Sequence, residues 1–259
     1  MQREQKLLLL KIVSLFSVIR GYNIPIIIIA QYLSAIFIMA PEQRALSILL
    51  DFNIFILVFA SAIAIASGYI INNFFFFFKD LINRPKKSML DRLVSQKTKL
   101  QVYFTLNFIV ALMAWFISWR ALLFFSFYIF LIWFYSHKLK KIVFIGNLSA
   151  ALLAVWPFFA ILLYYYQPTS IEELERHKDH FAVIIAHASF LFLLILIREL
   201  IKDLENLKGD LANNYHTIPV FYGENWSKRI STVLTILTLV PVYILIELYD
   251  VGYMDIYFY

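Results

Sequence analysis

Long apolar segments alternate with polar segments along most of this chain. Seven of the apolar segments approach the roughly 20 residues with which an α-helix crosses a bilayer. They lie near 22–40, 50–71, 100–118, 121–136, 144–166, 181–197 and 230–248. The pattern therefore predicts an all-α, polytopic transmembrane helix bundle that forms a single domain over residues 1–259.

The two ends of the chain depart from this pattern. Residues 1–21 combine four basic side chains with an amphipathic spacing, which predicts a segment that lies along the membrane surface. The last stretch, Val251–Tyr259, turns apolar again and resembles the beginning of a further span. We therefore expect about seven spans plus a truncated eighth.

Composition strengthens the membrane prediction. Of the 259 residues, 62% are hydrophobic and 18% are aromatic, and the mean hydropathy is +0.75. No soluble domain of this size needs so much apolar surface. The absence of cysteine excludes disulfides and cysteine-ligated metals. The net charge of +6 bears on membrane topology, and we expect no nucleic-acid partner.

Basic residues gather on one side of the predicted membrane. The amino terminus and the connections 72–99, 137–143 and 198–229 hold 19 of the 23 lysines and arginines, and the opposite side holds the other four. The positive-inside rule assigns the basic side to the cytoplasm. The sequence thus predicts a multi-pass integral protein of a bacterial or archaeal plasma membrane, with its two long polar loops, 72–99 and 198–229, facing the cytoplasm.

The first of these loops carries polar residues at helical spacing. Asn72 and Asp80 lie eight residues apart, which places them two turns apart on one helix face, with Phe76 midway between them. The second loop repeats the arrangement, because Glu199, Asp203, Asn206 and Asp210 also share a face. We expect the two faces to form one site at the membrane surface.

Acids, amides and bases that meet at a membrane surface suit the binding of a lipid diphosphate. Mg²⁺ prefers oxygen ligands and commonly bridges one or two carboxylates to substrate phosphates. Basic side chains would hold the remaining phosphate oxygens, and the candidates are Lys79, Arg84, Arg198 and Lys202. Departure of the diphosphate from an allylic carbon leaves a cation that aromatic faces stabilise, and Phe74–Phe78 and Tyr135 are candidates for that role.

Two motifs resemble the signature loops of the UbiA-type intramembrane prenyltransferases. Residues 68–85 read GYIINNFFFFFKDLINRP, and residues 198–210 read RELIKDLENLKGD, followed by Thr217 and Pro219. Lesser matches are Arg20 with Asn23, Tyr135-Ser136 followed by Leu139-Lys140, and Gly146-Asn147. The resemblance covers about residues 18–229. It implies that the chain transfers a polyprenyl group from an allylic diphosphate to a lipophilic acceptor, either a quinone-precursor ring or a glycerol-phosphate lipid.

The resemblance also implies roles for particular residues. It implies that Mg²⁺ is held by Asn72, Asp80, Asp203, Asn206 and Asp210, of which Asp80, Asp203 and Asp210 are the catalytic carboxylates. The expected substrate-binding residues are Asn23, Arg84, Tyr135, Lys140, Arg198 and Lys202. The chain departs from the family pattern at two positions, because Phe76 and Asn206 stand where the family has aspartate. The second motif favours the glycerol-lipid branch of the family.

Other interpretations of the same residues remain open. An impaired family member would bind a lipid diphosphate or a partner membrane protein without turnover, as Phe76 and Asn206 suggest. A small transporter would need charge near the membrane midplane, whereas the polar residues here gather at one side. Considered one at a time, the acidic residues of the two loops could be solvated, and Asn72 could cap the end of a helix. Tyr135 could likewise belong to an interfacial aromatic belt.

Overall fold

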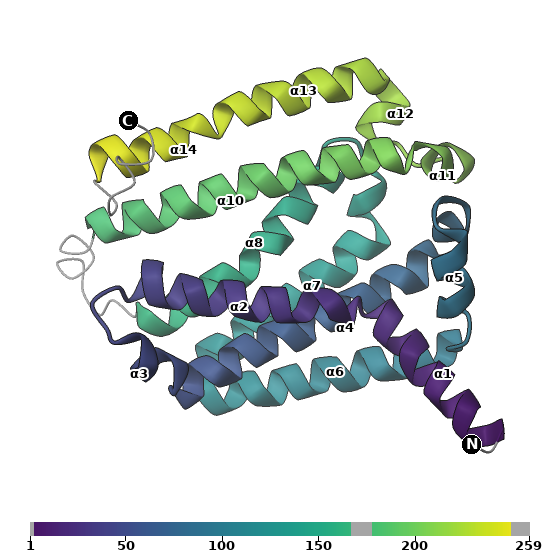
Figure 1. The fold of residues 1–259 in the computed structure, drawn as a ribbon, viewed down its shortest axis with the longest axis horizontal. Helices are drawn as coiled ribbons and strands as arrows, with labels where there is room; N and C mark the ends of the chain where they lie inside the picture. The colour runs from purple at the N-terminus through teal and green to yellow at the C-terminus, as the bar shows by residue number, and fades with distance from the viewer. Residues whose placement is uncertain (1–2, 167–177, 250–259) are drawn as a thin grey trace.

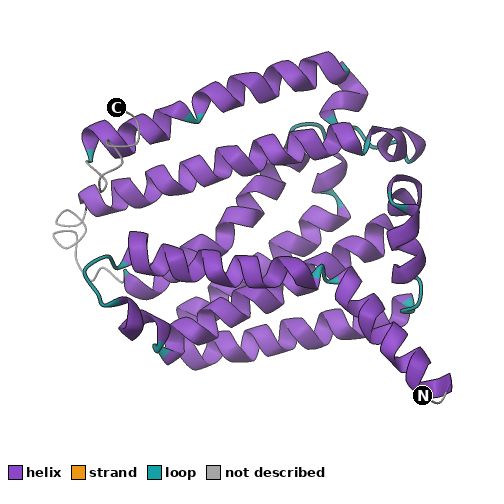
Figure 2. Ribbon diagram, viewed as in Figure 1, coloured by secondary structure: helices purple, strands orange, loops and turns teal. Residues whose placement is uncertain are grey.

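The computed structural model describes residues 3–166 and 178–249, and within these ranges the chain forms helices and no strands (Figure 2). In chain order the elements are α1 (Arg3–Val18), the 3-10 turn η1 (Gly21–Asn23), α2 (Ile24–Ser34), the π-helical turn η2 (Ala35–Met39), α3 (Ala45–Leu49), α4 (Phe52–Asn83), α5 (Pro85–Asp91), α6 (Gln96–Ile117), α7 (Trp119–His137), the 3-10 turn η3 (Leu139–Lys141), α8 (Ile145–Tyr165), α10 (Lys178–Glu205), α11 (Leu207–Ala212), α12 (Ile218–Tyr222), α13 (Glu224–Leu237), α14 (Leu239–Tyr243) and the π-helical turn η4 (Ile244–Leu248).

The seven predicted spans are confirmed. Within the described residues, seven helical stretches are long and apolar enough to cross a membrane, and each overlaps one of the predicted segments. Helix α4 packs against α6 and α7, while α10 packs against α8 and α13 (Figure 1). The prediction of a truncated eighth span falls on Val251–Tyr259, which lies outside the described residues.

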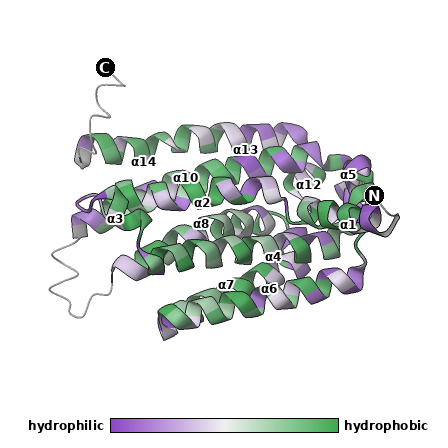
Figure 3. Cartoon of the chain, turned by 60° about the horizontal axis from the view of Figure 1, so that its bottom comes forward, coloured by the Kyte–Doolittle hydropathy of each residue, from purple (hydrophilic) through white to green (hydrophobic). Residues whose placement is uncertain are grey.

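The outer surface of the bundle is apolar, as a lipid environment requires. Large side chains such as Leu50, Phe37 and Phe116 are 75%, 70% and 77% exposed. Hydrophobic residues dominate along the helices, and hydrophilic residues gather near α5 and the amino terminus (Figure 3). A soluble protein would not leave so many large apolar groups in water, and the chain is therefore a multi-pass integral membrane protein.

The two polar loops predicted at 72–99 and 198–229 are largely helical. Helix α4 continues to Asn83 with a kink at Phe76, and α10 continues to Glu205. The predicted spans end at residues 71 and 197, but the residues beyond them contain no proline before residue 85 or 219. The helices therefore extend past the predicted ends, by about three turns in α4 and about two turns in α10.

Proline inside α8 creates a link between helices. Pro157 has no N–H, so the carbonyl of Leu153 one turn earlier loses its helical partner. The hydroxyl of Tyr128 on α7 donates to this carbonyl at 3.0 Å, and the side-chain amide of Gln31 on α2 donates to the Pro157 carbonyl at 3.0 Å. The polar groups that proline would leave unpaired thereby hold α2 and α7 against α8.

A buried polar network fixes the last turns of α4. The Lys99 ammonium on α6 donates to Asn73 Oδ1 at 2.8 Å, and Asn73 Nδ2 donates to Asp91 at 3.0 Å. Asp91 on α5 also accepts from the Ser17 hydroxyl of α1 at 2.9 Å. The network joins α1, α4, α5 and α6 at the polar end of the bundle, so that the first motif rests on a rigid support.

Candidate functional site

A cavity of ≈ 540 Å³ opens between the helices, polar at one end and apolar at the other. The polar end is formed by the last turns of α4, α7 and α10, where each helix leaves its apolar stretch. The earlier turns of the same helices, together with α2 and α8, supply the apolar wall, which includes Ile65, Ile132, Leu191 and Phe158. The cavity suits a ligand with a charged head and an apolar tail.

The structure brings together ten of the eleven residues predicted for the site. Those that line this cavity are Asn23, Asn72, Asp80, Arg84, Tyr135, Lys140, Arg198, Lys202, Asp203 and Asn206. Asp210 is the exception, because its side chain is fully buried behind the cavity wall and paired with Lys79. The acids Asp80 and Asp203 thus lie in one cavity, and the individual roles of all eleven residues remain predictions.

The charge of the cavity wall favours an anionic ligand. Six basic residues line it and only three acidic ones do so. The basic residues are Arg20, Lys79, Arg84, Lys140, Arg198 and Lys202, and the acidic ones are Asp80, Glu199 and Asp203. Guanidinium and ammonium groups are the usual partners of phosphate oxygens.

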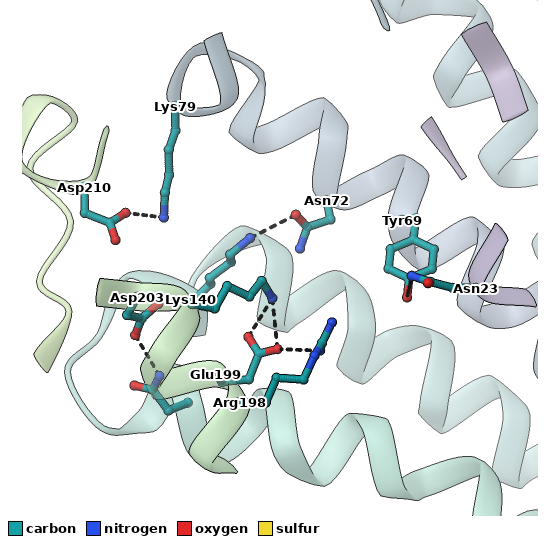
Figure 4. Close-up of polar contacts among 11 residues, drawn as sticks. Asn23, Tyr69, Asn72, Lys79, Lys140, Arg198, Glu199, Asp203 and Asp210 are labelled. Atoms are coloured by element: carbon teal, nitrogen blue, oxygen red, sulfur yellow. Dashed lines mark hydrogen bonds and ion pairs between the residues drawn. The ribbon is translucent and has the colours of Figure 1, made fainter. Parts of the chain in front are cut away.

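On the α10 side, acids project from successive turns of one continuous helix. Glu199 is bound by the Lys202 ammonium at 2.8 and 2.9 Å and by the Arg198 guanidinium at 3.2 Å (Figure 4). One turn later, Asp203 accepts from the Asn147 amide of α8 at 2.7 Å. The i, i+4 spacing of Glu199 and Asp203 thus places both carboxylates in the cavity, as the sequence predicted.

On the α4 side, the helix bends at Phe76. The backbone angles there (φ −108°, ψ 15°) are not helical, and the ring is 1% exposed. Asn72 and Asp80 both line the cavity, yet they are separated by this bend and not by two regular helical turns. The prediction of a single straight helix face is therefore wrong at Phe76, although its outcome for the two polar residues holds.

Lys140 of η3 lies next to the bend. Its ammonium donates to Asn72 Oδ1 at 2.9 Å and lies 3.9 Å from the centroid of the Phe76 ring. This is a cation–π contact at the position where the family pattern has an aspartate. The edge of the same ring faces Tyr215, with the ring centroids 5.5 Å apart.

Two contacts join the end of α4 to α11. The Lys79 ammonium forms an ion pair with Asp210, whose side chain has no exposed surface, and lies 4.9 Å from the Tyr215 ring centroid. Burial raises the pKa of the Asp210 carboxyl above its ordinary value, and the neighbouring Lys79 opposes this rise. Nearby, the Gly209 N–H donates to Asn83 Oδ1 at 2.9 Å.

Gly209 permits this close approach. A Cβ at residue 209 would lie 2.3 Å from Asn83 Nδ2, well inside van der Waals contact. The end of the first motif and the end of the second therefore meet at a point where only glycine fits without rearrangement.

A third group of polar residues lies at the entrance to α2. The guanidinium of Arg20 lies 5.1 Å from the centroid of the Tyr69 ring, and the Asn23 amide donates to the Tyr69 hydroxyl at 3.4 Å. The sequence linked Arg20 with Asn23 but missed Tyr69, which lies in the first motif itself. Asn147 was noted without a role, although a lone amide at the start of an apolar helix was a usable signal.

The phenylalanine run does not face the cavity. None of Phe74–Phe78 belongs to its lining; Phe78 is 73% exposed, and the ring of Phe77 lies beneath Lys99 and Arg92. The alternative interpretation of this run, packing or contact with lipid, therefore fits the structure better than a role in stabilising a carbocation. Tyr128 and Tyr135 are aromatic residues that do line the cavity.

Oxygen donors suited to a magnesium ion are present in the cavity. Within the described residues no group of three or more His, Cys, Asp or Glu is close enough to hold a metal alone. Mg²⁺ does not require such a cage, because it often uses one or two carboxylates together with substrate phosphates and water. Asp80, Asp203 and Asn206 line the cavity and fit that mode, whereas Asp210 is engaged by Lys79.

Comparison with known proteins gives one consistent match. The model of the UbiA prenyltransferase family matches residues 28–258. A digeranylgeranylglyceryl phosphate synthase of Methanobrevibacter smithii is 25% identical over 244 residues, covering 92% of this chain and 80% of the relative. Another of that name from Thermococcus sibiricus is 29% identical over 174 residues, covering 67% of this chain and 57% of the relative. This chain thus spans little more than half of the latter.

A solved structure shares the fold. The structure of a UbiA homolog from Archaeoglobus fulgidus bound to GPP and Mg²⁺ superposes with a TM-score of 0.67 and 16% sequence identity, covering 88% of this chain and 76% of that chain. The family model confirms the resemblance drawn from the two sequence motifs, and the solved structure confirms the helical bundle that it implied. The comparisons favour neither a binding protein without turnover nor a transporter.

Proposed function

Because this chain belongs to the UbiA prenyltransferase family, we propose that it transfers a geranylgeranyl group from geranylgeranyl diphosphate to the free hydroxyl of a glycerol-phosphate lipid. The relatives that match it are named digeranylgeranylglyceryl phosphate synthases, and that name describes a glyceryl phosphate with two such groups. An aromatic quinone precursor is the other acceptor that the sequence left open. The cationic cavity favours the lipid, as argued below.

The observation that carries this choice is the excess of basic residues at the polar end of the cavity. Both substrates of the proposed reaction bear phosphate at one end and an isoprenoid chain at the other. Six basic residues line the cavity against three acidic ones, and Lys79 is also paired with Asp210; the remaining positive charge can serve two phosphate-bearing heads, while the apolar wall receives the chains. A small aromatic acceptor with a single carboxylate would need fewer cations.

The reaction breaks one bond and forms one. The bond between C1 of the prenyl chain and the diphosphate oxygen breaks, and its electron pair leaves with the diphosphate. The hydroxyl oxygen of the acceptor bonds to C1, and its proton leaves with the diphosphate, so that atoms and charge balance. Arg84, Arg198 and Lys202 are placed to hold the departing group, and the apolar walls exclude water from C1.

Mg²⁺ is part of this proposal. When bound to the diphosphate, the ion would act as a Lewis acid that stabilises the negative charge of the leaving group. The residues that would hold it are Asp80, Asp203 and Asn206. We further propose an archaeal-type plasma membrane location with this end of the bundle in the cytoplasm, supported by the 19 basic residues on that side.

Product analysis tests the acceptor directly. The purified protein in detergent would be incubated with Mg²⁺, geranylgeranyl diphosphate and either geranylgeranylglyceryl phosphate or 4-hydroxybenzoate. We expect mass spectrometry to detect a product with two geranylgeranyl chains only with the lipid acceptor. A prenylated aromatic ring in its place would overturn the acceptor, and no product with either acceptor would overturn the proposed transfer.

A further inference from the structure

Lys140 differs from the other lysines of the cavity in the groups that surround it. Lys79 is paired with Asp210, and Lys202 is paired with Glu199. Within the described part of the chain, no carboxylate lies within ion-pair distance of the Lys140 ammonium. Its close contacts are to two neutral groups, the Asn72 oxygen at 2.9 Å (Figure 4) and the centroid of the Phe76 ring at 3.9 Å.

These two contacts orient the ammonium without cancelling its charge. An amide oxygen and an aromatic face attract a cation through their dipole and quadrupole, yet both remain neutral. A partly buried cation that lacks a counter-ion is costly unless a ligand supplies one. Because Lys140 lines the cavity, that counter-ion would be the charged head of the bound lipid.

Phe76 is essential to this arrangement. A carboxylate at this position would lie against the Lys140 ammonium and pair with it, as Asp210 pairs with Lys79. That carboxylate would neutralise the charge of the Lys140 ammonium, and a metal ion would then be needed for the site to attract the diphosphate. An aromatic ring keeps the cation in place and leaves its charge available.

We propose that Lys140, held between Asn72 and Phe76, is a built-in cation that replaces a metal ion on the α4 side of the diphosphate site. A prenyl diphosphate therefore binds beside Phe76 without a divalent cation, and one Mg²⁺ would be held by Asp203 and Asn206, with Asp80 as its ligand from the end of α4. In this proposal Phe76 is a positioning residue, and the absence of an aspartate at this position does not impair the site. The inference rests on the proposed function, because it assumes that a prenyl diphosphate occupies the cavity.

Binding in the presence and absence of metal tests the proposal. The probe is geranylgeranyl thiolodiphosphate, in which sulfur replaces the bridging oxygen so that the leaving group departs slowly. Isothermal titration in detergent, with Mg²⁺ or with EDTA, gives the affinity in each condition. For the wild type we expect chelation to weaken binding by less than about tenfold, a loss of about 1.4 kcal/mol.

Variants distinguish the specific contribution of Lys140 to binding from the effect of positive charge in general. Lys140→Met should weaken binding in EDTA by at least about tenfold, as loss of a charge-assisted contact implies. Lys138→Met, an exposed lysine two residues earlier, is the matched control and should change it little. Phe76→Asp should make binding depend on Mg²⁺. Because Phe76→Asp places an acid at a buried position and can fail to fold, Phe76→Leu keeps the site apolar and should weaken binding in EDTA by about three- to fivefold.

The outcomes are distinguishable. Binding of the wild type in Mg²⁺ that disappears in EDTA would overturn the built-in cation and leave the proposed function intact. Equal affinities for Lys140→Met and Lys138→Met in EDTA would also overturn it. Absence of binding in both conditions, with a folded protein by size-exclusion chromatography, would overturn the proposed function itself.

Discussion

The ends of α4 and α10, which carry the two motifs, both place charged residues at the membrane surface, but they do so with different geometry and different residues. On α10 the helix is regular, and Glu199 and Asp203 project one turn apart toward the cavity. On α4 the helix bends at Phe76, and lysines and aromatic rings fill the space near the bend. The α10 end offers oxygen atoms, whereas much of the α4 end offers cations.

This difference shows how a motif can lose an acid and still define a site. The missing carboxylate at residue 76 is matched by a lysine that has no acidic partner in the described structure, and the second-motif acid Asp210 is taken up by Lys79. Phe76 therefore stands in a surrounding where both neighbouring lysines have defined partners: Asn72 and the Phe76 ring for Lys140, and Asp210 for Lys79.

The largest effect is expected where the two ends are joined by a buried ion pair. Lys79→Met leaves the fully buried Asp210 unpaired, and we expect a loss of about 3–5 kcal/mol in the free energy of unfolding. Denaturant-induced unfolding in detergent measures it. Lys208→Met, at an exposed position, is the control and should stay within about 0.5 kcal/mol.

A second variant separates charge from packing at the same place. The double change Lys79→Met with Asp210→Leu removes both charges, and it should recover most of the stability lost in Lys79→Met alone. A double variant as unstable as the single one would mean that the pair contributes through shape and not through charge.

Activity should respond most strongly on the α10 side. Asp203→Asn keeps the shape of the side chain but removes its charge, and we expect the rate of diphosphate release to fall by about 10²–10³. Glu205→Gln, an exposed acid two residues later, should leave the rate nearly unchanged. If Asp203→Asn and Glu205→Gln changed the rate of diphosphate release equally, the carboxylates of α10 would contribute only through their overall negative charge and not through their position.

The close contact between Asn83 of α4 and Gly209 of α11 can be tested by adding side-chain volume at residue 209. Gly209→Ala places a Cβ against Asn83, and we expect a destabilisation of about 1–3 kcal/mol by thermal or chemical unfolding. Asn83→Ala should relieve the clash, so the double variant should be more stable than the sum of the single effects predicts. Strict additivity would contradict a direct contact between residues 83 and 209.

The smallest effect is expected from strengthening the α10 side. Asn206→Asp adds a charge to a residue that already lines the cavity. The Mg²⁺ concentration for half-maximal activity should fall by up to about fivefold, as an added charge contact at a partly exposed position implies. A rise in that concentration would show that residue 206 does not face the metal.

The sequence was sufficient for the spans, and most of the residues that it predicted for the site line one cavity. Apolar length located seven helices, and the motifs identified Asn72, Asp80, Asp203 and Asn206, which all line one cavity although the helix is kinked between the first two. Composition alone could not find where α4 and α10 end, because polar residues at helical spacing continue both helices past the apolar stretch.

The sequence could not predict which partner each of the site lysines contacts. Lys79, Lys140 and Lys202 are alike as residues, but their partners come from α11, from α4 and from within α10. Which of them keeps its charge free depends on the bend at Phe76 and on the approach of η3, both of which are tertiary features. The sequence marked Phe76 as a missing ligand and gave no sign of the lysine beside it.

The division between a metal side and a cation side is tested most directly by counting bound metal. Electron paramagnetic resonance would measure Mn²⁺ bound per chain in the presence of geranylgeranyl thiolodiphosphate. We expect about one ion per chain, in line with Mg²⁺ sites built from one or two carboxylates. That ion should be lost in Asp203→Asn and retained in Phe76→Leu. A chain that binds no Mn²⁺, or whose Mn²⁺ survives Asp203→Asn, would contradict the account.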